Sequence, residues 1–363
     1  MRKRGPDDQG DWWSEDGRVG IGHRRLAITQ PRYGCQPIDS EFCTVAVNGE
    51  FYGLGPEFGT RSASWALPTL YRRYGLAGAL DRLRGEFAFI LYDQRERKLF
   101  VVRDRFGIKP LFWARRGPEW WFASKPSALW SAGIPAAWCE ESFLQAAHTQ
   151  YPAPGRSLFR GVRTVRPGHF LTLSGEMMET RYWQAPEASE TVCAESFLER
   201  LRECVHTRVR KDAPSAVLLS GGVDSAAVAA LASEADQDVQ AYTVDFPNQG
   251  SFSEGSKAAL QAEYSGLPHR VVSLTSDQIL GELAEAVGRA EGLCVNGHLV
   301  AKMKLAEAVS EDGRQVLLTG EGADELLFGY RHFRSYFGET VDPLADTAGL
   351  GILTTTTSAE LPP

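Results

Sequence analysis

The clearest chemistry in this 363-residue sequence lies in the stretch Ser220-Gly221-Gly222-Val223-Asp224-Ser225. An apolar run, Ala216 to Leu219, precedes it, and an alanine-rich run, Ala226 to Ala232, follows it. Two adjacent glycines let backbone N–H groups approach phosphate oxygens without a Cβ in the way. A helix N-terminus adds partial positive charge, and Ser220 and Ser225 add hydroxyl donors. The pattern predicts a loop between a strand and a helix that grips pyrophosphate.

This loop differs from the phosphate loop of kinase-type enzymes. The pattern G-x-x-x-x-G-K-S/T is absent from the sequence, and with it the lysine that reaches the outer phosphates. A grip on pyrophosphate suits attack at the innermost phosphorus of ATP, which gives an acyl-adenylate. Asp224 can hold Mg²⁺, which neutralises the pyrophosphate as it leaves. The competing interpretation is a plain Gly-Gly turn with a Ser or Asp helix cap.

A second polar loop follows another apolar run, Gln315 to Leu318. It reads Thr319-Gly320-Glu321-Gly322-Ala323-Asp324-Glu325. Ligands of open α/β sheets bind at the carboxyl ends of the strands, so we expect these acids to face the same crevice as the first loop. The alternative is a solvated acidic loop that caps a helix.

The order of apolar runs divides the chain into parts. Residues 1 to about 185 are rich in short apolar runs separated by Gly, Pro and Asp, which predicts strands, with one helix from Leu67 to Tyr74. A polar linker, roughly Gln184 to Thr191, follows. Beyond it, runs of strand and helix character alternate as far as Leu318, which predicts a parallel sheet covered on both faces.

Composition narrows the class of protein. The chain has 43% hydrophobic and 23% charged residues, as soluble globular proteins do. A net charge of −7 argues against a nucleic-acid partner. Six cysteines without a C-x-x-C pair fit neither a zinc site nor a disulfide framework. No run of 18 apolar residues occurs, so we expect no membrane span and a cytoplasmic location.

Together the two loops resemble those of the asparagine synthetase family, whose members pair S-G-G-x-D-S with S-G-E-G-A-D-E. Here Thr319 replaces the first Ser of the second loop. The resemblance implies a ligase that uses ATP and Mg²⁺. It also implies a role for each matching residue: an adenosine site at Leu218, Val244, Thr319 and Gly320, Mg²⁺ ligands at Asp224 and Asp324, and Glu321 as the catalytic acid near the adenylate and the attacking amine.

The first part of the chain is similar to the glutaminase half of the same family. Four characteristic stretches carry the resemblance, and they arrive in family order: Arg4 to Asp7, Gly22 to Leu26, Val47 to Glu50 and Arg103 to Leu111. The implied reaction is amide hydrolysis by a cysteine exposed at the N-terminus. The resemblance implies that Asn48 and Gly49 form the oxyanion hole, that Arg25 binds the glutamine carboxylate, and that Glu50 lies in the glutamine pocket. From residue type alone, Asn-Gly predicts a hairpin turn and Arg25 a surface charge.

Three departures from the family pattern affect this interpretation. Met1-Arg2 resembles an internal position of relatives, so we expect the nucleophilic cysteine and its strand to be missing through truncation or a misassigned start. The family acid that holds the substrate ammonium is replaced by Ala63. No lysine follows Lys304, whereas relatives supply a pyrophosphate-contacting lysine from later helices. We therefore expect a vestigial glutaminase pocket.

The expected fold class is α/β, with a truncated N-terminal-nucleophile αββα sandwich followed by a parallel-sheet ATP-pyrophosphatase (PP-loop) domain. The expected boundaries are 1–185 for the amidotransferase-like domain, 190–337 for the ATP-pyrophosphatase domain without its C-terminal helical part, and 338–363 for an unstructured tail.

Three functions remain open at this point. The first is an ATP-dependent amide synthetase of the asparagine synthetase type that acts on a small carboxylate and ammonia or an amine. The second is the same chemistry in a β-lactam-forming or peptide-cyclising enzyme, which the replacement by Ala63 favours. The third is a non-catalytic remnant, or a subunit completed by another chain. A homodimer is also possible, and neither nucleic acid nor membrane is expected as a partner.

Overall fold

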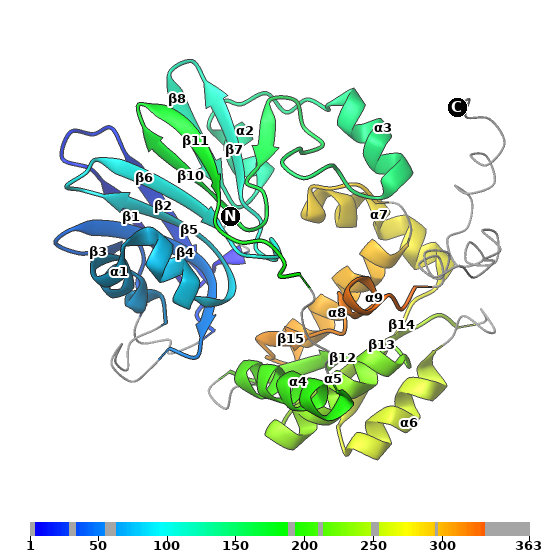
Figure 1. Ribbon diagram of the computed structural model, residues 1–363. Helices are drawn as coiled ribbons and strands as arrows, with labels where there is room; N and C mark the ends of the chain where they lie inside the picture. The colour runs from blue at the N-terminus through cyan, green and yellow to red at the C-terminus, as the bar shows by residue number, and fades with distance from the viewer. Residues whose placement is uncertain are drawn as a thin grey trace. The chain divides into compact units, whose positions relative to one another are not determined.

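The computed structural model describes residues 4–28, 34–54, 63–187, 193–209, 213–247, 254–294 and 297–330 (Figure 1). Its contacts divide the chain into a first unit, Met1–Val192 with Ala290–Leu293, and a second unit, Cys193–Arg289 with Cys294–Pro363. The expected tail, 338–363, lies outside the described residues.

Antiparallel pairing organises the first unit. A hairpin joins β1 (Asp8–Trp13) to β2 (Gly20–Arg25). Among the described residues a six-stranded sheet has the order β11-β10-β6-β5-β4-β3, and a three-stranded sheet has the order β8-β7-β9. The strands of these two sheets are β3 (Ile38–Asp39), β4 (Cys43–Tyr52), β5 (Arg84–Asp93), β6 (Lys98–Arg103), β7 (Phe112–Arg116), β8 (Glu119–Ala123), β9 (Val162–Thr164), β10 (His169–Ser174) and β11 (Glu176–Arg181).

The alternation of side chains along β5 shows how these sheets are layered. Phe87 and Phe89 pack with leucines of α1 (Ala66–Arg82), which follows the short 3-10 turn η3 (Ala63–Trp65). Ala88, which points to the opposite face, packs with Leu111 at the start of the three-stranded sheet. That sheet carries α2 (Pro126–Ser131) and α3 (Glu140–Thr149) on its far side, through the core that contains Leu129 and Ala146. The first unit is therefore an αββα sandwich, as expected.

A buried aspartate shapes the turn between β6 and β7. Asp104 is 1% exposed, and its carboxylate accepts the backbone N–H groups of Phe106, Ile108 and Lys109 at 2.9–3.0 Å. The guanidinium of Arg103 donates to the carbonyl oxygens of Lys109, Gly107 and Val165. This stretch, which resembles the family, is therefore a tightly hydrogen-bonded turn. The bond from its backbone N–H to Asp104 fixes the position of the Lys109 backbone between β6 and β7.

The second unit is built on a parallel sheet with the order β14-β13-β12-β15 among the described residues. Its strands are β12 (Ser215–Leu218), β13 (Gln240–Asp245), β14 (His269–Ser273) and β15 (Val316–Leu318). Its helices are α4 (Ala194–Arg208), α5 (Val223–Ala235), α6 (Gly255–Ser265), α7 (Ser276–Ala290), α8 (His298–Glu311) and α9 (Ala323–Leu327).

Helices cover both faces of this sheet. Val217 and Ala241 pack with side chains of α4, α5 and α6. Ala216 and Tyr242, one residue away in each strand, pack with Leu305, Ala308 and Val309 of α8. The parallel sheet between two helical layers confirms the fold expected for this part of the chain.

The elements expected from the sequence occur in the structure, and most of their ends differ by a few residues. The expected helix from Leu67 to Tyr74 continues as far as Arg82 because α1 runs on through a kink at Gly75, where φ is 67°. Strands without a strong apolar run were missed, among them β1 and β2, whose mixed side chains carry little periodicity. Their pairing with each other stabilises them instead.

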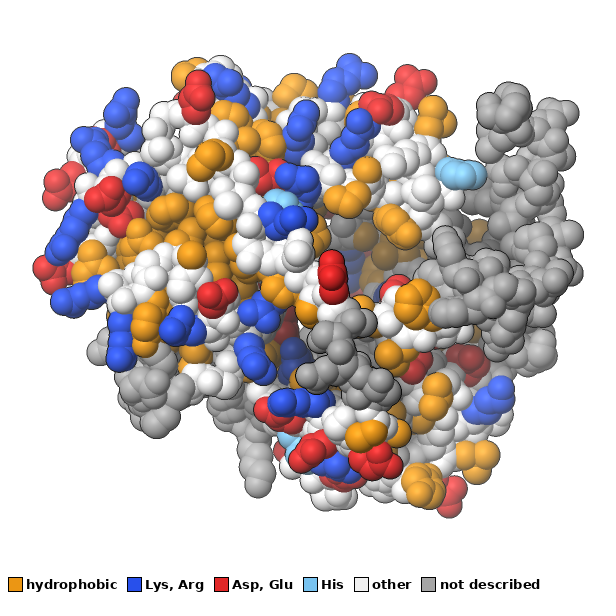
Figure 2. Space-filling view, in the orientation of Figure 1, with side chains coloured by type: hydrophobic (Ala, Val, Ile, Leu, Met, Phe, Trp, Pro, Cys, Tyr) orange, Lys and Arg blue, Asp and Glu red, His pale blue; other side chains and the backbone are white. Residues whose placement is uncertain are grey.

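Part of the apolar surface is exposed. Hydrophobic side chains gather on the face of the first unit that Figure 2 shows, where β1, β2, β5 and β6 lie in Figure 1. Trp13 of β1 is 65% exposed, and Tyr151 after α3 is 70% exposed.

A helix long and apolar enough to cross a membrane does not occur in the ranges that the structure describes.

Replacing Asp104 with alanine is expected to lower the free energy of unfolding of the first unit by about 2–4 kcal/mol, because three backbone N–H groups lose a charged acceptor. Urea unfolding followed by tryptophan fluorescence measures the loss. Asp11→Ala, at an exposed position of β1, is the matched control, and we expect it to stay within about 0.5 kcal/mol. An equal effect of both substitutions would contradict the structural role of Asp104.

Candidate functional site

The two loops singled out in the sequence lie side by side in the second unit. The first follows β12 and the second follows β15, and these strands are parallel neighbours. A Cβ on Gly320 would lie 3.0 Å from the backbone nitrogen of Ser225 and 3.1 Å from the carbonyl carbon of Asp224. The second loop therefore packs directly on the start of α5, and a side chain at position 320 would have to displace backbone atoms there. The structure therefore confirms that the two loops are neighbours at the carboxyl ends of paired strands.

The first loop is braced by its own serines. The hydroxyl of the buried Ser225 accepts the backbone N–H of Ser220 at 3.2 Å and donates to the carbonyl of Gly222 at 3.0 Å. Gly221 has φ = 82°, a conformation that side chains disfavour. Gly222, the N-cap of α5, has no side-chain cap, and the first N–H groups of a helix have no acceptor inside it. These groups are available to an anion at the loop.

Two carboxylates approach each other across the loops. Burial raises the pKa of Asp324, and the charges of Asp224 and Glu325 raise it further. Such mutual repulsion is relieved by a cation. The described residues contain no group of three or more His, Cys, Asp or Glu side chains arranged to hold a metal ion. A pair of carboxylates is nevertheless enough for Mg²⁺, which completes its coordination with water and substrate phosphates. Asp224 and Asp324 fit such an ion.

Glu321 is held by a partner that sequence patterns did not indicate. Its Oε1 lies 2.8 Å from Nζ of Lys302, which α8 contributes. Both side chains are more than half exposed, so the pair contributes about 1 kcal/mol at most to stability. The main effect of the ion pair is to orient the carboxylate of Glu321 toward α8. A lysine in the middle of a helix carries no local signal of such a role.

Leu218 ends β12 and Val244 is the last residue but one of the neighbouring β13, and both pack with the core beneath α8. Both side chains are half-buried, and Thr319 beyond β15 is exposed. Three of the four residues expected around an adenosine therefore lie at or just beyond the carboxyl ends of three adjacent strands, and the fourth, Gly320, follows Thr319 in the second loop.

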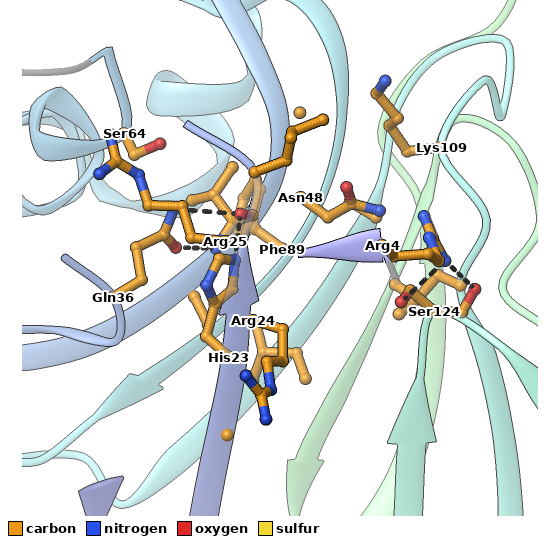
Figure 3. Close-up of a pocket in the computed structure, with 18 of the residues that line it drawn as sticks. Arg4, His23, Arg24, Arg25, Gln36, Asn48, Ser64, Phe89, Lys109 and Ser124 are labelled. Carbon is orange, nitrogen blue, oxygen red and sulfur yellow. Dashed lines mark hydrogen bonds between the residues drawn. The ribbon is translucent and has the colours of Figure 1, made fainter. Parts of the chain in front are cut away.

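A pocket of about 490 Å³ opens in the first unit (Figure 3). It brings together the stretches that resemble the glutaminase half, and all four residues expected there line it, namely Arg25, Asn48, Gly49 and Glu50. Its other lining side chains include Arg4, His23, Arg24, Gln36, Ser64, Phe89, Lys109 and Ser124. Four cationic side chains thus line the pocket, with Glu50 as the carboxylate among the described lining residues.

Asn48 and Gly49 lie inside β4 and are not a hairpin turn. They pair with Ala88 and Phe87 of β5. Gly49 has φ = 143°, and a Cβ there would lie 2.1 Å from the carbonyl oxygen of Glu86. The strands approach so closely that a side chain is excluded. Nδ2 of Asn48 is buried and has no hydrogen-bond partner among the described residues. In Figure 3 its amide lies on the side of the pocket occupied by Lys109 and Arg4.

Arg25 is also not an ordinary surface charge. It ends β2, is 9% exposed, and extends toward Ser64 in Figure 3. A buried guanidinium in a pocket suits a carboxylate ligand, since the planar fork can donate two parallel hydrogen bonds.

Gln36 and His23 form a network at the base of the pocket. Nε2 of His23 donates to the carbonyl of Val47 at 3.0 Å, and Gln36 contacts both the N–H and the carbonyl of Val47. Burial lowers the pKa of His23, which favours the neutral ring with Nδ1 as an acceptor. Gln36 had no signal in the sequence, because its role depends on the chain returning beside β4.

The αββα sandwich with this pocket, joined to a parallel-sheet unit with paired polar loops, defines a glutamine amidotransferase-type protein that carries a synthetase unit. The family model described as glutamine amidotransferase domain matches residues 1–183, and the model described as asparagine synthase matches residues 196–350. The chain belongs to the asparagine synthetase family.

Individual relatives agree with this assignment. The amidase chry2 of Gibberella zeae is 31% identical over 92% of this chain and 54% of its own length. A putative asparagine synthetase (glutamine-hydrolyzing) of Mycobacterium tuberculosis is 31% identical over 92% of this chain and 56% of its own. Asparagine synthetase (glutamine-hydrolyzing) 1 of Bacillus subtilis is 29% identical over 91% and 54%. The chain thus spans about half the length of these relatives.

Among solved structures, the glutamine phosphoribosylpyrophosphate amidotransferase of B. subtilis matches 69% of this chain and 51% of its own chain. The identity is 16% and the TM-score is 0.32, too low a likeness to carry an argument.

Gly320→Ala is expected to push the two loops of the second unit apart, because the new Cβ meets backbone atoms of Asp224 and Ser225 that cannot move independently of α5. The free energy of unfolding of this unit should fall by about 1–3 kcal/mol. Gly281→Ala, in α7, is the matched control, since its Cβ meets nothing within 4 Å. Thermal unfolding of both variants tests the contact, and a Gly320→Ala protein as stable as the control would disprove it.

Proposed function

We propose that the second unit activates a carboxylate with ATP and passes the acyl group to ammonia or an amine, as an AMP-forming amide synthetase. The observation that carries the proposal is the packing of Gly320 on Asp224 and Ser225. It joins a loop suited to phosphate with a loop that bears acids, at the carboxyl ends of neighbouring parallel strands.

The reaction has two steps in this proposal. A carboxylate oxygen attacks the α-phosphorus of ATP, and the bond to the β-phosphate oxygen breaks, which releases pyrophosphate. The nitrogen of ammonia or an amine then attacks the acyl carbon, and the bond to AMP breaks. Holding both reactants at one loop supplies much of the rate by proximity.

The residues of the chain would divide this work. Backbone N–H groups at Gly221 and Gly222 and at the start of α5 bind the phosphates. Leu218, Val244, Thr319 and Gly320 surround the adenosine. Asp224 and Asp324 would hold Mg²⁺, whose charge offsets that of the departing pyrophosphate. Glu321, oriented by Lys302, takes the proton that the attacking amine loses.

We also propose that the first unit does not hydrolyse glutamine. The ammonium group of glutamine needs a carboxylate partner. The resemblance to the family implies that Ala63 stands in the place of this acid, and the described lining of the pocket offers four cationic side chains against Glu50. The amine would then come from free ammonia or from the carboxylate substrate itself. The second case describes a ring-forming synthetase, which is the alternative function.

The adenylation step can be tested by carboxylate-dependent exchange of labelled pyrophosphate into ATP. We expect Asp224→Ala to abolish this exchange, because the phosphates lose their cation. Asp277→Ala, an exposed acid in the first turn of α7, is the matched control and should leave exchange unchanged. Full exchange by Asp224→Ala would refute the role of Asp224. No exchange by the unaltered chain with any carboxylate would favour a non-catalytic protein. A second assay separates the two synthetase functions. The protein is incubated with ATP and either aspartate with ammonia or an amine-bearing carboxylate that can cyclise, and the mass of the product shows which amide forms.

The absence of glutamine hydrolysis in the first unit can be tested separately. Incubation with glutamine is expected to release no ammonia above the level of buffer alone, because among the described lining residues four cationic side chains oppose the single carboxylate of Glu50 where the substrate ammonium would bind. Ammonia is followed by a coupled enzymatic assay. Release that depends on the protein, and that Asn48→Ala abolishes, would overturn this part of the proposal.

A further inference from the structure

The first turn of α6 packs against the phosphate-binding loop. A Cβ on Gly221 would lie 3.0 Å from Cβ of Lys257 and 3.5 Å from the carbonyl oxygen of Glu254. One turn further along the helix, Nε2 of Gln261 donates to the carbonyl of Gly221 at 3.2 Å. The glycine that gives the loop its shape is therefore seated on α6, and Lys257 begins its side chain directly beside it.

Lys257 differs from the lysines of α8. Lys302 pairs with Glu321, and Lys304 pairs with Glu282 and Glu307. Lys257 is exposed and forms no ion pair or hydrogen bond within the ranges that the structure describes. Its ammonium group is therefore available to a ligand, on a flexible stem whose base is fixed against the loop.

The chemistry of the loop calls for such a cation. The motif itself contains no lysine, unlike the loops of kinase-type enzymes. When the bond to the α-phosphorus breaks, negative charge grows on the departing pyrophosphate. A positively charged group positioned where charge develops lowers the barrier, and backbone N–H groups alone carry only partial charges.

We propose that Lys257 contacts the β- and γ-phosphates of ATP and stabilises the pyrophosphate that leaves. The proposal rests on the function proposed above, since it assigns a further residue to the same site. Lys257 is supplied by α6, which follows β13, whereas the acids of the second loop follow β15, on the other side of β12 in the sheet.

The test compares Lys257→Met and Lys257→Arg with the unaltered protein by calorimetric titration with ATP, inorganic pyrophosphate and AMP, each with Mg²⁺. We expect Lys257→Met to bind ATP and pyrophosphate about tenfold more weakly, equivalent to the loss of one charge-assisted contact. AMP, which lacks the outer phosphates, should bind equally to all proteins. Lys257→Arg should retain most of the affinity because it keeps the charge.

Arg200→Met is the matched control. It removes one positive charge from the same unit, where Arg200 pairs with the exposed Glu203 and with no other acid of the described residues. This variant should bind all three probes as the unaltered protein does.

The outcomes separate the two proposals. If the unaltered protein binds ATP and Lys257→Met binds it equally well, the role of Lys257 is refuted and the proposed function stands. A loss of AMP affinity equal to that of ATP would show that Lys257 only supports the loop, which also refutes the contact with the outer phosphates. If the unaltered protein binds neither ATP nor AMP, the proposed function fails, and the role of Lys257 fails with it.

Discussion

The parallel pairing of β15 with β12 is the constraint on which the proposed ATP site depends. Nearly a hundred residues separate the two strands in the chain. The pairing brings Gly320 within van der Waals contact of Asp224 and Ser225, so that a phosphate-binding turn and an acidic turn become one surface. Without this register the charge of Asp224 would not raise the pKa of Asp324. Each loop taken alone would then be an ordinary turn at the start of a helix.

Close backbone approach has a similar role in the first unit. Gly49 and Gly85 face the carbonyl oxygens of Glu86 and Glu50 across β4 and β5, where a Cβ would lie 2.0–2.1 Å from oxygen. This approach places Asn48 in the wall of the pocket rather than in a turn. The Asp104 turn acts from the other side, since it directs Lys109 toward the same pocket. Tight backbone packing thus arranges the polar lining, although the residues responsible are themselves not part of the proposed chemistry.

Much of the architecture could be predicted because the relevant signals are local. The period of apolar residues identified the strands and helices of the second unit, and the loop residues indicated their chemistry through backbone freedom and helix-end charge. The prediction was weaker where an element is stabilised by its partners. β1 and β2 have no apolar alternation of their own, and the hairpin and surface roles that residue type suggests for Asn48 and Arg25 were wrong.

The sequence by itself determined the class of fold, the identity of the two polar loops and the family to which the chain belongs. These follow from spacing and residue type within short stretches. Only the tertiary structure decided which groups meet: Glu321 with Lys302, Gln36 with Val47, and Lys257 with Gly221. The physical reason is that such contacts depend on how helices and strands pack together, and no local pattern encodes the partner of a side chain across that distance.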